Sequence, residues 1–148
     1  MHLIKIYIHL VFPTLDRKPF LDSKELRTRV WQHITENARQ KGIFVEQVNG
    51  YTDHCHCLIS LGSDQNIQKI VQLIKGESSH WINKNYLTAE KFNWQAGYIA
   101  VSVSESMIQE VRNYIIQQEK HHLKKSFSEE YPALSDKFHF RDDRNNFG

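Results

Sequence analysis

Cysteine, proline and long apolar runs are scarce in this chain of 148 residues. It has two cysteines and three prolines, and no stretch of about 18 consecutive apolar residues that would span a membrane. Apolar residues make up 40% and charged residues 24%, a balance that excludes a disordered, collagenous or low-complexity chain. The length predicts one domain. The opening segment MHLIKIYIHLVF contains a lysine and no small-residue cleavage site, which indicates a first strand rather than a signal peptide.

The two cysteines, Cys55 and Cys57, lie two positions apart in a segment that is typical of a strand. Alternate strand positions are about 6.6 Å apart, whereas a disulfide needs Cα atoms about 5.5–6 Å apart with converging side chains. We therefore expect reduced thiols that pack as small apolar side chains and a cytoplasmic protein. The lack of a long apolar run predicts no membrane partner.

Several catalytic signatures are also absent from the sequence. It has no G-x-x-x-x-G-K-[ST], no G-x-S-x-G and no H-E-x-x-H, which disfavours P-loop ATPases, α/β-hydrolases and zincins. The carboxylates form no obvious acidic metal cluster. The net charge is +2, and the tail after Ser126 is mildly acidic, so the preceding body is the more basic part of the chain. That distribution permits phosphate binding without requiring it.

Hydrophobic periodicity predicts alternating strands and helices over most of the chain. We expect strands at 3–12, 43–48, 54–61 and 97–104, helices from Asp22 or Ser23 to Gly42, at 66–86 and at 105–125, a hairpin or bulge at Asn49-Gly50, and a loop at 87–96. The order β-α-β-β-α-β predicts an α+β, ferredoxin-like (RRM-like) antiparallel sheet with an added C-terminal helix. The domain is expected to span residues 1–125, and 126–148 to form a loosely packed tail. Because this architecture hosts many functions, function must be argued from the site.

The sharpest local feature is the segment Asp53-His54-Cys55-His56-Cys57. On a strand, His54 and His56 point to one face, and their Cα atoms lie about 6.6 Å apart, so both imidazoles can bind one cation. The two cysteines then point to the opposite face, which disfavours a site that pools thiols with imidazoles. The alternative is a pair of solvated or hydrogen-bonded histidines on a sheet face.

A second feature lies in the last predicted helix. Tyr114 and Gln118 are four residues apart and therefore share one helical face. A phenolate becomes easier to form beside a bound cation, and the amide oxygen of Gln118 suits Mg²⁺ or Mn²⁺. The alternative is an ordinary amphipathic helix with Tyr114 partly packed and Gln118 solvated.

Taken in order, these motifs resemble the single-tyrosine transposases of the HUH nuclease superfamily, of the insertion-sequence and REP-associated type. The resemblance extends over roughly residues 3–125 and includes HLVFPTLDRKPFL at 9–21, Asp53 before the histidine pair, VQLIKGESS at 71–79 and GYIAVSVS before the tyrosine helix. Cys55, at the hydrophobic position between the histidines, is a mild departure from the family pattern. The tail after residue 125 gains no support from the resemblance.

The resemblance implies cleavage and joining of single-stranded DNA. Tyr114 would be the nucleophile and would become linked to the 5′-phosphate, while His54, His56 and Gln118 would hold a divalent metal, Mg²⁺ or Mn²⁺. It also implies a homodimer and single-stranded DNA substrates with hairpin ends.

Five basic or hydroxyl side chains are candidates for contacts to DNA: Lys75, Ser78, Ser79, Arg112 and Lys120. The first three lie off the apolar stripe of the second helix and the other two flank the tyrosine, so all can be directed at phosphates. A solvated helix face is the alternative. Trp81 and Trp94 offer rings for stacking on unpaired bases, although Trp81 lies on the apolar stripe and fits a core position better.

Three other functions stay open at this point. The first is a non-catalytic module that binds single-stranded nucleic acid on an open sheet face and needs no metal. The second is a metal-dependent hydrolase of small phosphoesters in which water is the nucleophile. The third is a transposase copy recruited to a host role, for instance on chromosomal repeats.

Overall fold

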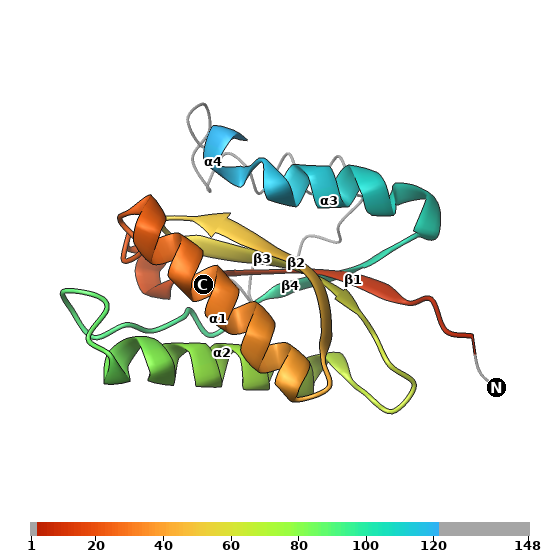
Figure 1. Ribbon diagram of the computed structural model, residues 1–148, viewed down its shortest axis with the longest axis horizontal. Coiled ribbons are helices and arrows are strands. Elements are labelled where there is room, and N and C mark those ends of the chain that lie inside the picture. The colour runs from red at the N-terminus through yellow and green to blue at the C-terminus, as the bar shows by residue number, and fades with distance from the viewer. Residues whose placement is uncertain (1–2, 122–148) are drawn as a thin grey trace.

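The computed structural model describes residues 3–121 and contains one four-stranded antiparallel sheet with the strand order β2-β3-β1-β4 (Figure 1). The elements are β1 (Tyr7–Pro13), η1 (Leu15–Arg17), α1 (Lys24–Gln40), β2 (Phe44–Tyr51), β3 (His54–Ser60), α2 (Ile67–Lys84), β4 (Ile99–Val103), η2 (Glu105–Met107), α3 (Ile108–Ile116) and α4 (Gln118–His121). The predicted α+β class and the β-α-β-β-α-β order are confirmed. Among the described helices, none is long and apolar enough to cross a bilayer.

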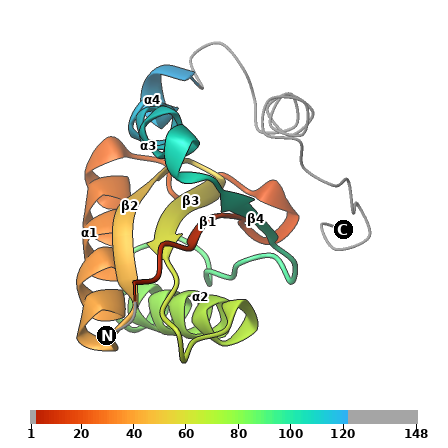
Figure 2. The same ribbon diagram turned by 90° about the vertical axis from the view of Figure 1, so that its right-hand side faces the viewer.

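The sheet separates two layers of helices. Helices α1 and α2 cover one face, and α3 and α4 lie over the other (Figure 2). Strand alternation divides the side chains of the central strands between these layers. Leu10 and Phe12 of β1 join Cys55 and Cys57 of β3 in the main core beneath α1 and α2. The opposite face carries Leu58, which packs against α3.

Side-chain caps fix the starts of the two core helices. The Ser23 hydroxyl accepts a hydrogen bond from the Leu26 backbone N–H (3.1 Å), and the Asn66 side chain accepts one from Lys69 (2.9 Å). Gly42 follows α1 with a φ of +78°, a conformation that favours glycine at a helix end. Both helix starts lie where the sequence placed them.

Two strand predictions need correction. The first strand begins at Tyr7 rather than at residue 3. Asn49 and Gly50 form neither a hairpin turn nor a bulge: β2 continues to Tyr51, its register shift lies between Val45 and Gln47, and the chain reverses at 52–53. Gly50 pairs with Cys55 in the ladder, and a Cβ atom there would clash with the backbone carbonyl of His54. The glycine therefore serves close strand packing, not a positive φ angle.

The last predicted helix is also not continuous. It begins as the 3₁₀ turn η2, continues as α3 and breaks at Gln117 before the four-residue α4. Asn49 explains the break, since its side-chain amide donates to the backbone carbonyls of Ile115 (2.9 Å) and Ile116 (3.0 Å). In an uninterrupted helix, those carbonyls would accept from N–H groups four residues later. The predicted helical residues 122–125 and the predicted tail 126–148 lie outside the described residues.

Candidate active site

His54 and His56 are both completely buried on β3, on the sheet face that α3 and α4 cover. Their ring centroids are 5.0 Å apart and their ring planes meet at 77°. Each histidine is held by a strand on both sides, because β3 pairs with β1 and with β2. The backbone of the sheet thus fixes the spacing of the two imidazoles.

Asp53 and Gln118 contact opposite nitrogens of the His54 ring. Nδ1 of His54 lies 2.8 Å from a carboxylate oxygen of Asp53, and Nε2 lies 3.1 Å from the amide oxygen of Gln118. Because the carboxylate accepts the Nδ1 proton, a neutral His54 presents a lone pair at Nε2. The Gln118 oxygen faces that lone pair because the Gln118 amide nitrogen donates to the Tyr114 carbonyl (3.2 Å).

The His54–Gln118 pair fits a cation in the site. Two acceptors that face each other repel unless a proton or a metal ion lies beside both of them. Two ligand atoms about 2.1 Å from one ion, at a right angle to each other, are about 3.0 Å apart, close to the separation of the two side-chain atoms. Imidazole nitrogen with amide oxygen also suits Mg²⁺ or Mn²⁺ better than a thiolate set does.

Tyr114 completes the cluster from α3. Its half-buried ring lies 5.6 Å from the His56 ring and 6.3 Å from the His9 ring, between centroids, and is steeply inclined to both. The structure therefore brings Tyr114, Gln118 and both strand histidines together within a single chain. Gln118 is fully buried, unlike the solvated glutamine of an ordinary amphipathic helix.

Sequence reasoning missed His9. This residue of β1 is buried, and its Nε2 lies 2.9 Å from Nδ1 of His56, with the two rings stacked at 5.2 Å. Strand alternation contains the signal that would have found it. Leu10 and Phe12 face the main core, so His9 must share the other face with the strand β3 histidines.

Two of the residues predicted to contact DNA have internal roles instead. Ser78 is buried, donates to the Ile74 carbonyl (2.6 Å) and accepts from Nε1 of the buried Trp94 (2.9 Å). The prediction that Ser78 contacts a phosphate is therefore wrong for this structure, and the buried Trp94 offers no face for a base. Lys75 donates to the backbone carbonyls of Gln95 and Gly97, and burial lowers its pKa to about 8.

The other candidates for DNA contact lie nearer the surface. Ser79 is half-buried and donates to the Gly76 carbonyl (3.2 Å), whereas Lys120 is exposed. Arg112 forms an ion pair with Glu46 of β2 (3.1 Å). Trp81 is half-buried and stacks on the ring of His33 at 3.9 Å.

The thiols take no part in the cluster. Cys55 and Cys57 are fully buried on the other face of β3, with their sulfur atoms 3.8 Å apart. Burial raises the pKa of the Cys55 thiol, which disfavours the thiolate that a metal would need. Among residues 3–121, no three His, Cys, Asp or Glu side chains form a metal-binding group.

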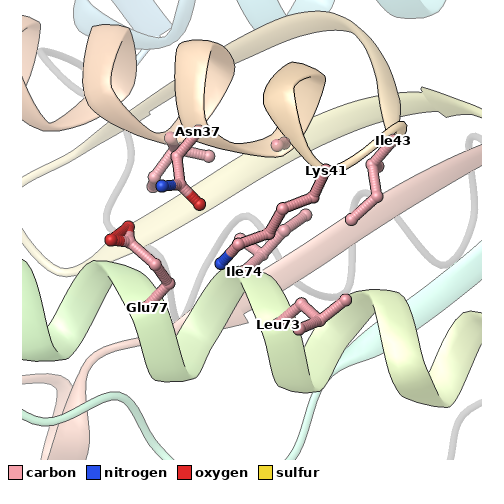
Figure 3. Close-up of a pocket in the computed structure, with 8 residues that line it drawn as sticks. Asn37, Lys41, Ile43, Leu73, Ile74 and Glu77 are labelled. Carbon is pink, nitrogen blue, oxygen red and sulfur yellow. The ribbon is translucent and has the colours of Figure 1, made fainter.

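A small pocket lies elsewhere, between α1 and α2. Figure 3 shows Asn37 and Lys41 on its α1 side and Leu73, Ile74 and Glu77 on its α2 side. Because α1 and α2 cover the sheet face opposite the histidines, this pocket is not part of the cluster.

The family follows from comparison with known proteins. The model of the family described as "Transposase IS200 like" matches residues 2–118, which include the predicted nucleophile and the three predicted metal ligands. The chain belongs to this family. Membership makes it a transposase by descent and so a DNA-processing enzyme. The IS200-like region ends at Gln118, the residue where α4 begins.

Two solved structures share the fold of this IS200-like chain. One is a crystal structure of a candidate transposase from Deinococcus radiodurans R1, with 21% identity, a TM-score of 0.63, and 79% of this chain and 93% of that chain covered. The other is a REP-associated tyrosine transposase bound to a REP hairpin, with 14% identity, a TM-score of 0.61, and 82% and 71% covered. No curated protein matches the chain.

Proposed function

We propose that this chain cleaves and rejoins single-stranded DNA through a covalent bond between Tyr114 and a 5′-phosphate, at a Mg²⁺ or Mn²⁺ site made by His54, His56 and Gln118. The observation that supports the proposal best is the meeting of these four side chains in one cluster, in which His54, His56 and Gln118 are fully buried and 3.1 Å separates His54 Nε2 from the Gln118 oxygen. A binding module that only stacks bases does not require that β3 and a helix some 60 positions later bring their side chains together.

The residues divide the chemistry between them. Asp53 holds the proton of His54 at Nδ1 and so keeps Nε2 available as a ligand. A bound divalent ion would supply charge to offset the negative charge that develops on the scissile phosphate. Tyr114 gives its phenolic proton to solvent and its oxygen forms the new O–P bond. The bond from phosphorus to the 3′-oxygen breaks, and that oxygen takes up a proton from solvent and leaves as a hydroxyl. Rejoining reverses these steps with another 3′-hydroxyl, so no ATP is needed.

We extend the proposal to the substrate and the assembly. The REP-associated relative is bound to a REP hairpin, which supports single-stranded DNA with hairpin ends as the substrate here. Arg112 and Lys120, on either side of the tyrosine, are the cations best placed in sequence to attract its phosphates. A homodimer in the cytoplasm completes the proposal, since two-fold assembly is the commonest oligomeric state.

The decisive experiment seeks the covalent intermediate. Incubation of the protein with hairpin-bearing single-stranded DNA and Mn²⁺ should give a DNA-linked protein band that survives a denaturing gel. Tyr114→Phe should abolish this band and leave DNA binding intact. Tyr86→Phe is the matched control, because Tyr86 is 89% exposed and lies outside the cluster.

The same experiment separates the other functions. Cleavage that persists in Tyr114→Phe would identify water as the nucleophile and favour a phosphoesterase. DNA binding without cleavage, and without any need for metal, would favour a binding module or a transposase recruited to a host role.

A further inference from the structure

Gln118 occupies its place without the support of a continuous helix. The helical hydrogen bonding of α3 ends at Gln117, and α4 contributes only four residues beyond it. Gln118 is nevertheless fully buried against His54. A contact outside the helix must therefore hold α4 against the body of the protein.

Arg27 of α1 makes that contact. Its Nε and Nη2 donate to the two carboxylate oxygens of Glu119, at 2.7 and 3.0 Å. Its Nη1 donates to the Leu21 carbonyl (2.7 Å), and the guanidinium lies over the Tyr51 ring at 4.9 Å from the ring centroid. Arg27 is only 6% exposed although it lies near the beginning of a helix.

The two parallel bonds fix both the position and the orientation of Glu119. A planar guanidinium paired with a carboxylate allows little rotation, unlike the single bond of a lysine. Glu119 follows Gln118 directly in the chain, so fixing Glu119 also fixes the backbone from which the Gln118 amide reaches His54. The bond to the Leu21 carbonyl and the contact with the Tyr51 ring also hold the guanidinium in place.

We propose that Arg27 is a positioning residue for the metal site, and that its bidentate pair with Glu119 holds the Gln118 oxygen in ligand position. This inference rests on the proposed function, because it assigns Arg27 a role through one of the proposed ligands. A buried charge pair contributes little stability compared with apolar side chains of the same size. The pair does fix the orientation of α4, and a proposed ligand on a four-residue helix needs that restraint.

Mn²⁺ titration by calorimetry, without DNA, tests the proposal. Arg27→Gln and Glu119→Gln should each weaken Mn²⁺ binding by about 10-fold, at the lower end of the range for residues that orient metal ligands, and by no more than Gln118→Ala does. The double variant should bind Mn²⁺ no more weakly than the weaker-binding single variant, because both substitutions remove the same contact. Arg27→Lys should recover part of the affinity. Arg39→Gln, on the same helix but bonded to the Val45 carbonyl, should bind Mn²⁺ like the unmodified protein.

Thermal unfolding of each variant separates positioning from simple stability. A lower melting temperature with unchanged Mn²⁺ affinity in Arg27→Gln and Glu119→Gln, while Gln118→Ala weakens binding, would overturn the proposal and leave the proposed function standing. If Arg27→Gln fails to fold, Glu119→Gln decides the matter, since its side chain is 32% exposed. Unchanged Mn²⁺ affinity in His54→Ala would instead remove the proposed metal site itself.

Discussion

The cluster joins two parts that are built in different ways. His54 and His56 belong to β3, whose backbone is paired on both sides, with His54 opposite Pro13 and Tyr51. Tyr114 and Gln118 belong to a peripheral helical segment of 14 residues, from Ile108 to His121, with a break inside it. We refer to these as the strand half and the helix half.

Different forces hold the two halves. Ladder hydrogen bonds set the strand half, so its side chains can change without moving the backbone. The helix half is fastened by a small apolar cluster that includes Val111 and Ile115, and by side-chain bonds from Asn49 and Arg27. We therefore expect the helix half to open at a lower free energy than the sheet does. In such a site the proposed nucleophile is the movable part and the paired imidazoles are the fixed part.

The largest expected effect comes from a substitution of Gly50, which pairs with Cys55 of β3 and so supports the strand half. Gly50→Ala places a Cβ atom against the His54 backbone carbonyl and 2.9 Å from Cζ2 of Trp31, and neither β3 nor the packed ring can retreat easily. The free energy of unfolding should fall by about 3 kcal/mol, at the upper end for overpacking. Urea denaturation measures the change.

Gly76→Ala is the control, because a Cβ at that helical position meets nothing within 4 Å. It should raise the free energy of unfolding by about 0.5–1 kcal/mol. A Gly50→Ala protein as stable as the unmodified one would mean that β2 and β3 can separate near His54, which contradicts a fixed strand half.

The strand half could be predicted from the sequence because the two-residue period of a strand determines the face to which each side chain points. Once 54–60 is a strand, His54 and His56 must share a face, and the cysteines between and after them must point into the core. The same rule places His9 on this face, but a lone histidine in an apolar strand forms no motif that marks it as part of a site.

The helix half was predictable only in part. The period of 3.6 residues placed Tyr114 near Gln118 correctly, yet it predicted one helix over 105–125. The break at Gln117 depends on Asn49, which is remote in sequence and for which the sequence predicts a hairpin or bulge. The prediction that Ser78 contacts a phosphate was wrong for a similar reason, since helix periodicity does not show that the loop carrying Trp94 packs over Ser78.

Removal of single proposed ligands should distinguish the halves in Mn²⁺ affinity. His54→Ala removes a fixed imidazole and should weaken Mn²⁺ binding by more than about 100-fold, beyond the range for residues that only orient ligands. Gln118→Ala removes an oxygen from the movable half and should cost about 10-fold. Calorimetric titration gives both constants, and a larger loss for Gln118→Ala would reverse the ranking of the two halves.

His9 offers a test inside the strand half. His9→Ala removes the nitrogen that lies 2.9 Å from Nδ1 of His56, so the His56 ring loses one restraint. Mn²⁺ affinity should fall by about 10-fold. His9→Gln, whose amide can still bond to Nδ1, should recover most of it. Equal losses in both variants would show that His9 acts through packing alone.

Asn49→Ala should loosen the helix half while leaving the sheet intact. It removes two hydrogen bonds to the carbonyls of Ile115 and Ile116, together worth about 1–2 kcal/mol. Hydrogen exchange should quicken in α3 and α4 and stay unchanged in β1 and β3. Asn83→Ala, which releases the Phe92 backbone instead, is the control. Faster exchange across the whole sheet in Asn49→Ala would show that the two halves open as one unit.

Lys75 extends the comparison to the loop before β4, which is also fastened by a side chain. Burial lowers the Lys75 pKa from its ordinary 10.5 to about 8, so between these values the unfolded chain binds more protons than the folded protein. The free energy of unfolding therefore gains a contribution from Lys75 as the pH rises through that window, by less than about 1 kcal/mol because the amine is partly solvated. Denaturation at about pH 7 and about pH 10 should show that the free energy of unfolding of the unmodified protein gains on that of Lys75→Met. The control is Lys69→Met, at an exposed position of α2, which should show the same pH dependence as the unmodified protein. Parallel pH dependence of the unmodified protein and Lys75→Met would mean that the lysine titrates as it does in the unfolded chain, and that its bonds to Gln95 and Gly97 offset the burial.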